Sequence, residues 1–192
     1  MKPRPLDMFV TIMVTSFLTL LPMTLHADAS GDPPEQRSYA DDRAAIEDLQ
    51  ARYMFALDFK DAEAYAATFA PDGILDFGRG EIKGRDAIAE MVANMRADFE
   101  QDIDEDTSGL RPVAGRHSIT NIVIKVDGDR ATGRAYWFHM GNDNPERAAQ
   151  LNSFGHYEDE MVRIDGQWFF AQRKIYNEQV AEWAGSIDNP AW

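Results

Sequence analysis

The chain has 192 residues, with 33 aspartates and glutamates against 19 lysines and arginines, and therefore a net charge of −14. So acidic a chain repels nucleic acid and anionic lipid, and we expect neither as a partner. The chain also has no cysteine, which excludes disulfides, a thiol nucleophile and a thiolate metal site.

Residues 1–29 have the three-part layout of a secretory signal peptide. Lys2 and Arg4 make a basic start, and a largely apolar run over 8–21 follows, which is short for a membrane span. We expect cleavage after Ala29, which gives a periplasmic or secreted protein with no membrane attachment. An uncleaved membrane anchor is the alternative.

The rest of the chain is expected to form one domain between two less regular segments. Residues 30–40, with glycine, proline and serine, indicate a linker, and 41–176 carry the pattern of a folded domain. The tail, 177–192, has Trp183 and Trp192 among polar residues. Because exposed tryptophans need cover, the tail is expected either to fold over the domain or to pack on a partner subunit.

Residues 42–61 predict the first helix, capped by Asp41 or Asp42. Asp58 follows an apolar stripe directly, in a setting where a carboxylate needs a partner. The stripe recurs at spacings of three and four, as on the buried face of a helix, and consists of Ile46, Leu49, Tyr53 and Leu57.

Two more helices are predicted, at 62–69 and 87–98, with a short strand at 74–77 between them. Pro71 ends the first of these helices. The acidic stretch 99–114 is expected to be irregular.

The second half of the domain changes to the period of a sheet. Two Asp-Gly pairs, at 127–128 and 165–166, are typical hairpin turns, so the strands are expected to form an antiparallel meander. Together with the helices this predicts an α+β fold, a cone-shaped curved antiparallel sheet packed on three N-terminal helices. The predicted strands are 116–126, 130–140, 151–164 and 167–176.

His117 stands near the start of the first long strand. With the period of a strand it shares a face with Ile119, Asn121 and Val123. Both faces of this strand are mostly apolar, so His117 needs a hydrogen-bond partner. A curved sheet packed on the first helix could bring Asp58 to it.

The chain resembles the SnoaL-like branch of the nuclear-transport-factor-2-like superfamily, over roughly residues 42–176. That branch includes scytalone dehydratase, bile-acid 7α-dehydratase and hexachlorocyclohexane dehydrochlorinase. The resemblance rests on an Ala-Ile-x-x-Leu run before Tyr53 and Asp58, on Phe69-Ala-Pro-Asp-Gly, Gly84-Arg-Asp-Ala-Ile88 and His117, and on Gly133-Arg-Ala-Tyr136 and Ile164-Asp-Gly-Gln-Trp168.

The resemblance implies a cone fold and a small-molecule substrate. It implies elimination without a cofactor from a cyclic, aromatic or polycyclic compound, with Asp58 paired to His117 as the base and Tyr53 as a hydrogen-bond donor to the substrate. Such a carboxylate fixes the imidazole tautomer and stabilises the imidazolium that proton capture creates. Family habit also predicts a homodimer or higher homo-oligomer.

Three further residues are candidates for substrate contact. His139 and His156 each lie among aromatic residues of a predicted strand, and the resemblance places a second site histidine near His139. Asn121 is a candidate because it is expected to share a face with His117.

Other interpretations of the same residues remain open. Asp58 could be a helix cap and His117 a core histidine. An isomerase of unsaturated ketones would use a lone carboxylate in the same cone, and a binding module would use neither residue chemically. No histidines have metal-ligand spacing, so we expect no metal site, and the acidic segment 102–107 lacks the glycine and glutamate of a calcium loop.

Overall fold

The computed structural model describes residues 38–78, 80–105, 109–110, 112–186 and 188–191. The predicted signal peptide, 1–29, lies outside the described residues, and so does the predicted linker up to residue 37. No helix in the described part of the chain is long and apolar enough to cross a membrane.

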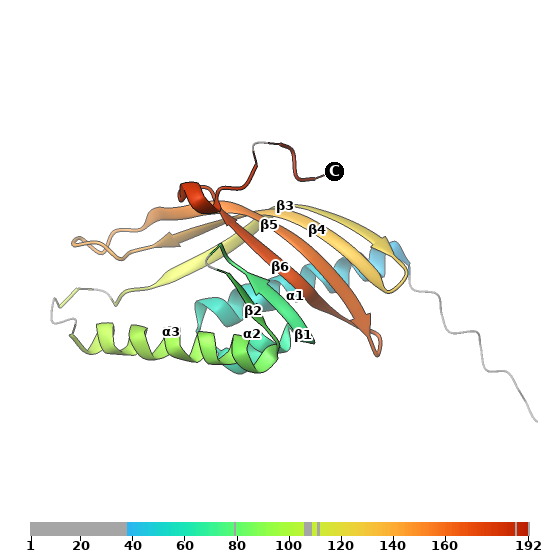
Figure 1. Ribbon diagram of the computed structural model, residues 1–192. Coiled ribbons are helices and arrows are strands. Elements are labelled where there is room, and N and C mark those ends of the chain that lie inside the picture. The colour runs from blue at the N-terminus through green and yellow to red at the C-terminus, as the bar shows by residue number, and fades with distance from the viewer. Residues whose placement is uncertain (1–37, 79, 106–108, 111, 187, 192) are drawn as a thin grey trace, which may run out of the picture. The chain divides into compact units, whose positions relative to one another are not determined.

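Three helices lie on one side of a single curved sheet (Figure 1). The helices are α1 (Tyr39–Asp58), α2 (Ala62–Ala67) and α3 (Arg85–Glu105), and a short 3-10 turn, η1 (Ala181–Trp183), lies in the tail. The strands are β1 (Phe69–Asp76), β2 (Glu81–Lys83), β3 (Gly115–Asp127), β4 (Arg130–Gly141), β5 (Gln150–Ile164) and β6 (Gln167–Asn177).

The strand order is β2-β1-β6-β5-β4-β3. Strands β3 to β6 form the predicted antiparallel meander. The β3–β4 and β5–β6 hairpins turn at the two Asp-Gly pairs, and residues 142–149 connect β4 to β5. The pairing of β1 with β6 is parallel, which the sequence did not indicate because these strands are far apart in the chain. The predicted α+β fold, with a curved sheet over three helices, is confirmed.

Several predicted boundaries are corrected. The N-cap of α1 is Ser38, in a reciprocal capping box with Asp41, rather than Asp41 or Asp42. Asp42 instead lies buried and accepts hydrogen bonds from the side chains of Trp168 and Arg163, which anchor α1 to the sheet.

Three other elements differ in length from the predictions. Helix α2 ends at Ala67, and β1 runs through Pro71 because the register with β6 shifts between Phe69 and Ile74, where a proline is tolerated. Helix α3 continues to Glu105, so the acidic stretch is helical well past residue 98.

The core lies between the helices and one face of the sheet. We call this the inner face; its side chains include Trp137 and Tyr157, which pack in one hydrophobic cluster with Tyr53 of α1. Because successive side chains alternate across a strand, Tyr136 and its cross-strand partner His156 lie on the opposite, outer face.

Candidate functional site

Asp58 is the last residue of α1, and the way that helix ends fixes its position. The backbone N–H of Lys60 donates to the Leu57 carbonyl at 3.1 Å, and that of Asp61 donates to the Ala56 carbonyl at 2.9 Å. This is a Schellman motif with Lys60 in the left-handed region at φ 52°, where glycine is usual. The motif stops the helix so that Asp58 lies beside the first residues of β3.

The structure brings Asp58 and His117 together. His117 Nδ1 lies 2.7 Å from Asp58 Oδ1, and the His117 backbone N–H donates to the same carboxylate at 3.0 Å. The Asp58 side chain is only 6% exposed and that of His117 is 23% exposed. An ionised carboxylate can only accept, so Nδ1 carries the proton and Nε2 is left as the basic nitrogen.

A second imidazole stacks on the first. His139 is the cross-strand partner of His117, and their rings lie 4.4 Å apart at an angle of 22°. Burial lowers the pKa of His139, and the neighbouring His117 lowers it further. A Cβ at Gly115 would collide with His139 Nε2, so the absence of a side chain there lets the second ring occupy this position.

The surroundings of the two rings are aromatic and carry positive charge. The ring of Trp137 lies 6.2 Å from that of His117, and Trp137 Nε1 donates to the Tyr176 carbonyl. The chain neighbours of His117 and Asp58 also contact each other, because the guanidinium of Arg116 lies 4.7 Å from the ring of Phe59, which is 62% exposed. The exposed ring of Phe59 therefore gives apolar surface next to Asp58 in the chain.

Tyr53, the predicted hydrogen-bond donor, lies in the core. Its side chain is fully buried, and its hydroxyl is 2.7 Å from that of Tyr65. Burial raises the pKa of Tyr53, which keeps the phenol neutral. Tyr53 therefore shares the inner side of the sheet with His117, but its hydroxyl is enclosed.

A buried ion pair that the sequence analysis missed lies next to Tyr53. Arg173 and Asp159 face each other across β5 and β6, both are fully buried, and two hydrogen bonds of 2.9 and 2.8 Å join them. The guanidinium lies 4.2 Å from the Tyr53 ring and 4.1 Å from the Tyr157 ring. In the sequence, the sign of this ion pair was that Arg173 and Asp159 each occupy an inward-facing strand position between large apolar residues.

The expectation that Asn121 shares a face with His117 is wrong. The register of β3 against β4 shifts between Thr120 and Val123, and Asn121 itself has φ of 54°. This bulge changes the alternation, so Asn121 lines a small outer-face pocket with Tyr136 and His156.

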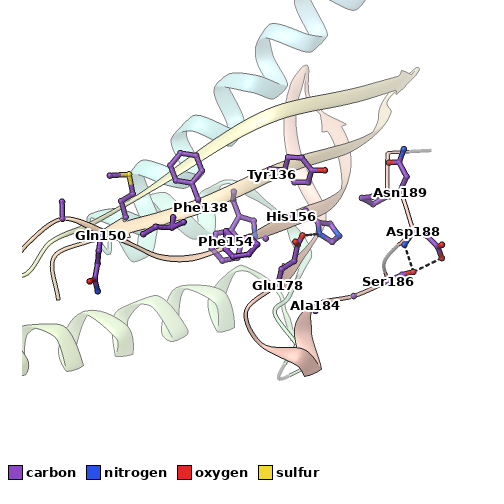
Figure 2. Close-up of a pocket in the computed structure, with 17 residues that line it drawn as sticks. Tyr136, Phe138, Gln150, Phe154, His156, Glu178, Ala184, Ser186, Asp188 and Asn189 are labelled. Carbon is purple, nitrogen blue, oxygen red and sulfur yellow. Dashed lines mark hydrogen bonds and ion pairs between the residues drawn. The ribbon is translucent and has the colours of Figure 1, made fainter. Parts of the chain in front are cut away.

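His156 also lies away from His117, on the outer face of β5. Its Nδ1 is 2.9 Å from Glu178 Oε1, and its ring stacks on that of Tyr176 at 4.4 Å. Figure 2 shows His156 and Glu178 in a pocket with Tyr136. The three candidate histidines thus divide between two faces of the sheet.

Metal ligands do not gather in the described part of the chain. No group of three or more histidine, aspartate or glutamate side chains there could hold an ion.

Comparison with solved structures gives several relatives of similar fold. A function-unknown protein from Mycobacterium tuberculosis is 27% identical, with a TM-score of 0.60 over 78% of this chain and 82% of that one. A protein from Catenulispora acidiphila, solved in complex with S-DNPA, is 26% identical, with a TM-score of 0.60 over 73% and 96%.

A proposed scytalone dehydratase from Novosphingobium aromaticivorans is 25% identical, with a TM-score of 0.53 over 71% of this chain and 83% of that one. No curated protein matches the chain. The sequence pattern of the SnoaL-like domain matches residues 38–174, which is most of the chain. The chain therefore belongs to the SnoaL-like family, with the nuclear-transport-factor-2-like fold that its sequence predicted.

Proposed function

We propose that this protein is a cofactor-independent lyase that eliminates water or a similar leaving group from a small cyclic, aromatic or polycyclic compound. The observation that carries the proposal is the 2.7 Å contact between Asp58 Oδ1 and His117 Nδ1, in a pair whose imidazole remains partly exposed.

His117 acts as the base. Nε2 takes a proton from the carbon adjacent to the one that bears the leaving group. The electrons of that C–H bond form the new double bond between these two carbons. The leaving hydroxide takes up this proton from the His117 imidazolium and departs as water, which returns the imidazole to its neutral form. Asp58 favours this step because a carboxylate on Nδ1 stabilises the imidazolium that forms.

The stacked His139 supplies the second polar group of the site. Its lowered pKa keeps it neutral beside the imidazolium, so it can donate a hydrogen bond to a substrate oxygen without adding a second positive ring.

The role of Tyr53 as a hydrogen-bond donor to the substrate stays a prediction. The proposed elimination does not use it, because its hydroxyl is enclosed with that of Tyr65. Periplasmic or secreted localisation and homo-oligomerisation likewise stay predictions. The mass of the exported chain and its mass by light scattering would test them.

The experiment is an elimination assay on β-hydroxy cyclic ketones. A β-hydroxy tetralone is a suitable probe, since loss of water gives an enone that becomes a fluorescent naphthol. Wild type should form naphthol at a rate above background, and His117→Ala and Asp58→Asn should lose that rate while the melting temperature stays near that of wild type.

Two results would contradict the proposal. Retained turnover with a large loss of stability would make Asp58 and His117 structural residues. Binding of the probe with no chemical change, at an affinity that both variants keep, would make this a binding module.

A further inference from the structure

The inner face of the sheet carries one more polar side chain close to His139, that of Asn152 on β5. The register of β4 against β5 shifts between His139 and Met140, so that Asn152 is an extra residue in β5. Such a bulge re-aims a side chain and is common next to active sites. The bulge therefore accounts for an inward asparagine at a position that plain alternation along β5 would send to the outer face.

Contacts around Gly141 place the Asn152 amide on the inner side. A Cβ on Gly141 would lie 2.6 Å from Asn152 Nδ2 and 3.4 Å from His139 Cε1, so the two side chains approach the same point. Gly115, the cross-strand partner of Gly141, likewise leaves room for the His139 ring. Neither glycine has a φ in the left-handed region, so what these positions require is space. The paired glycines thus clear the sheet surface for an imidazole and an amide.

The Asn152 amide forms no hydrogen bond within the described part of the chain, and its Oδ1 is buried. Asn142, which follows Gly141, is different. It accepts from the Ala114 backbone N–H at 2.6 Å and donates to the Pro112 carbonyl at 3.0 Å, so both ends of its amide hold the strand ends together. Because buried polar groups normally have a hydrogen-bond partner, the amide of Asn152 is the one that a ligand can use.

Three polar side chains follow one another across the inner face. His117, His139 and Asn152 lie on the adjacent strands β3, β4 and β5, and the two imidazole rings stack at 4.4 Å. A flat aromatic substrate with its reacting C–H at His117 Nε2 would extend across the His139 ring toward the amide. A ketone next to the reacting carbon would then face His139 and Asn152.

We propose that Asn152 Nδ2 donates a hydrogen bond to the ketone oxygen of the substrate, beside the hydrogen bond from His139. The inference rests on the proposed elimination at His117, and it assigns the substrate to the β-hydroxy ketones. While His117 takes the proton, the electrons of the C–H bond spread onto the ketone oxygen, and they return to form the carbon–carbon double bond as hydroxide leaves. Two donors on that oxygen stabilise the charge that builds there.

Turnover of the β-hydroxy tetralone tests this role. Asn152→Ala should lower kcat by about 10²-fold, as loss of one oxyanion donor does, and should keep a melting temperature near that of wild type because the amide has no partner in the described chain. Asn152→Asp keeps the shape without an N–H to donate, so it should show the same loss and serves if Asn152→Ala fails to fold. Gln167→Ala removes an exposed amide opposite the far end of β5 and should turn over as wild type does.

Binding of α-naphthol tests the same contact without turnover. Its oxygen is the former ketone oxygen of the substrate, and its anion carries the negative charge that the two donors would stabilise. Wild type should favour naphtholate over neutral naphthol, compared with free solution, and Asn152→Ala should lower this preference by roughly tenfold. The absorbance of the bound naphthol as a function of pH measures it.

Turnover that His117→Ala removes and Asn152→Ala keeps would overturn the role of Asn152 and leave the elimination in place. A naphtholate preference that wild type lacks, or that Asn152→Ala retains in full, would also overturn it. If wild type turns over no tetralone but its naphtholate preference depends on Asn152, the proposed elimination fails and oxygen binding by Asn152 stands. A large fall in the melting temperature of Asn152→Ala, with kcat unchanged, would make Asn152 a structural residue.

Discussion

The two faces of the sheet each carry an imidazole paired to a carboxylate, and their surroundings differ. On the inner face the Asp58 side chain is 6% exposed and also binds the His117 backbone. On the outer face the Glu178 side chain is 36% exposed and comes from the chain after β6. The distances from the imidazole Nδ1 to the carboxylate oxygen are therefore similar, 2.7 and 2.9 Å, although the two carboxylates differ in exposure to water.

The difference shows why a contact distance alone does not identify a base. The inner carboxylate is shielded from water, so its charge acts strongly on the one ring it touches. The outer carboxylate is partly hydrated and its interaction with the ring is correspondingly screened. This contrast supports the proposed role of His117, the imidazole of the inner pair, as the base.

The largest expected effect separates the two pairs by turnover. His117→Ala should reduce the rate of naphthol formation by about 10³-fold, because a positioned base is worth 10²- to 10⁴-fold. His156→Ala is the matched change on the outer face. The rate of naphthol formation in this variant should stay at least about a hundredfold above that of His117→Ala. Similar losses in both variants would break the comparison.

The next effect concerns the buried pair on the inner face. Arg173→Met should lower the free energy of unfolding by about 3–5 kcal/mol, because it leaves the Asp159 charge buried without a partner. Urea unfolding measures this loss. Adding Asp159→Leu should recover much of it.

Lys174→Met is the matched control for Arg173→Met, since Lys174 is the next residue of β6 and its side chain is 42% exposed. It should cost less than about 1 kcal/mol, as exposed ion pairs usually do. A loss as large as that of Arg173→Met would show that burial of charge is not the cause.

A smaller effect tests the enclosed hydroxyls of Tyr53 and Tyr65. Tyr53→Phe and Tyr65→Phe should each cost about 1 kcal/mol, and the double variant should cost less than their sum, because one hydrogen bond joins the two. Both should keep turnover. A turnover loss confined to Tyr53→Phe would instead support the predicted role of Tyr53 as donor to the substrate.

The smallest effect is a pH dependence set by His139. Its pKa in the folded chain is lowered from the usual value near 6.5, so the unfolded chain binds more protons at mildly acid pH. Stability should therefore fall as the pH drops below this value, because protonation favours unfolding.

Unfolding curves measured between neutral and mildly acid pH would show this slope, and His139→Gln should flatten it. A wild-type stability that rises on acidification would contradict the assignment.

Local patterns determined much of this molecule. The spacing of Ile46, Leu49 and Tyr53 predicted the first helix with its buried face, and the two Asp-Gly turns predicted the meander. These signals are readable because helix and hairpin formation depend on neighbours in the chain. The family resemblance then named Asp58 and His117, which the fold brings together.

Only the tertiary structure decided which side chains share a face. One bulge in β3 sends Asn121 to the outer face, and strand alternation sends His156 there as well, although both were expected near His117. The parallel pairing of β1 with β6 and the buried contact of Arg173 with Asp159 join residues from separate strands. Such contacts depend on register and packing between distant segments, which the period of a single strand does not encode.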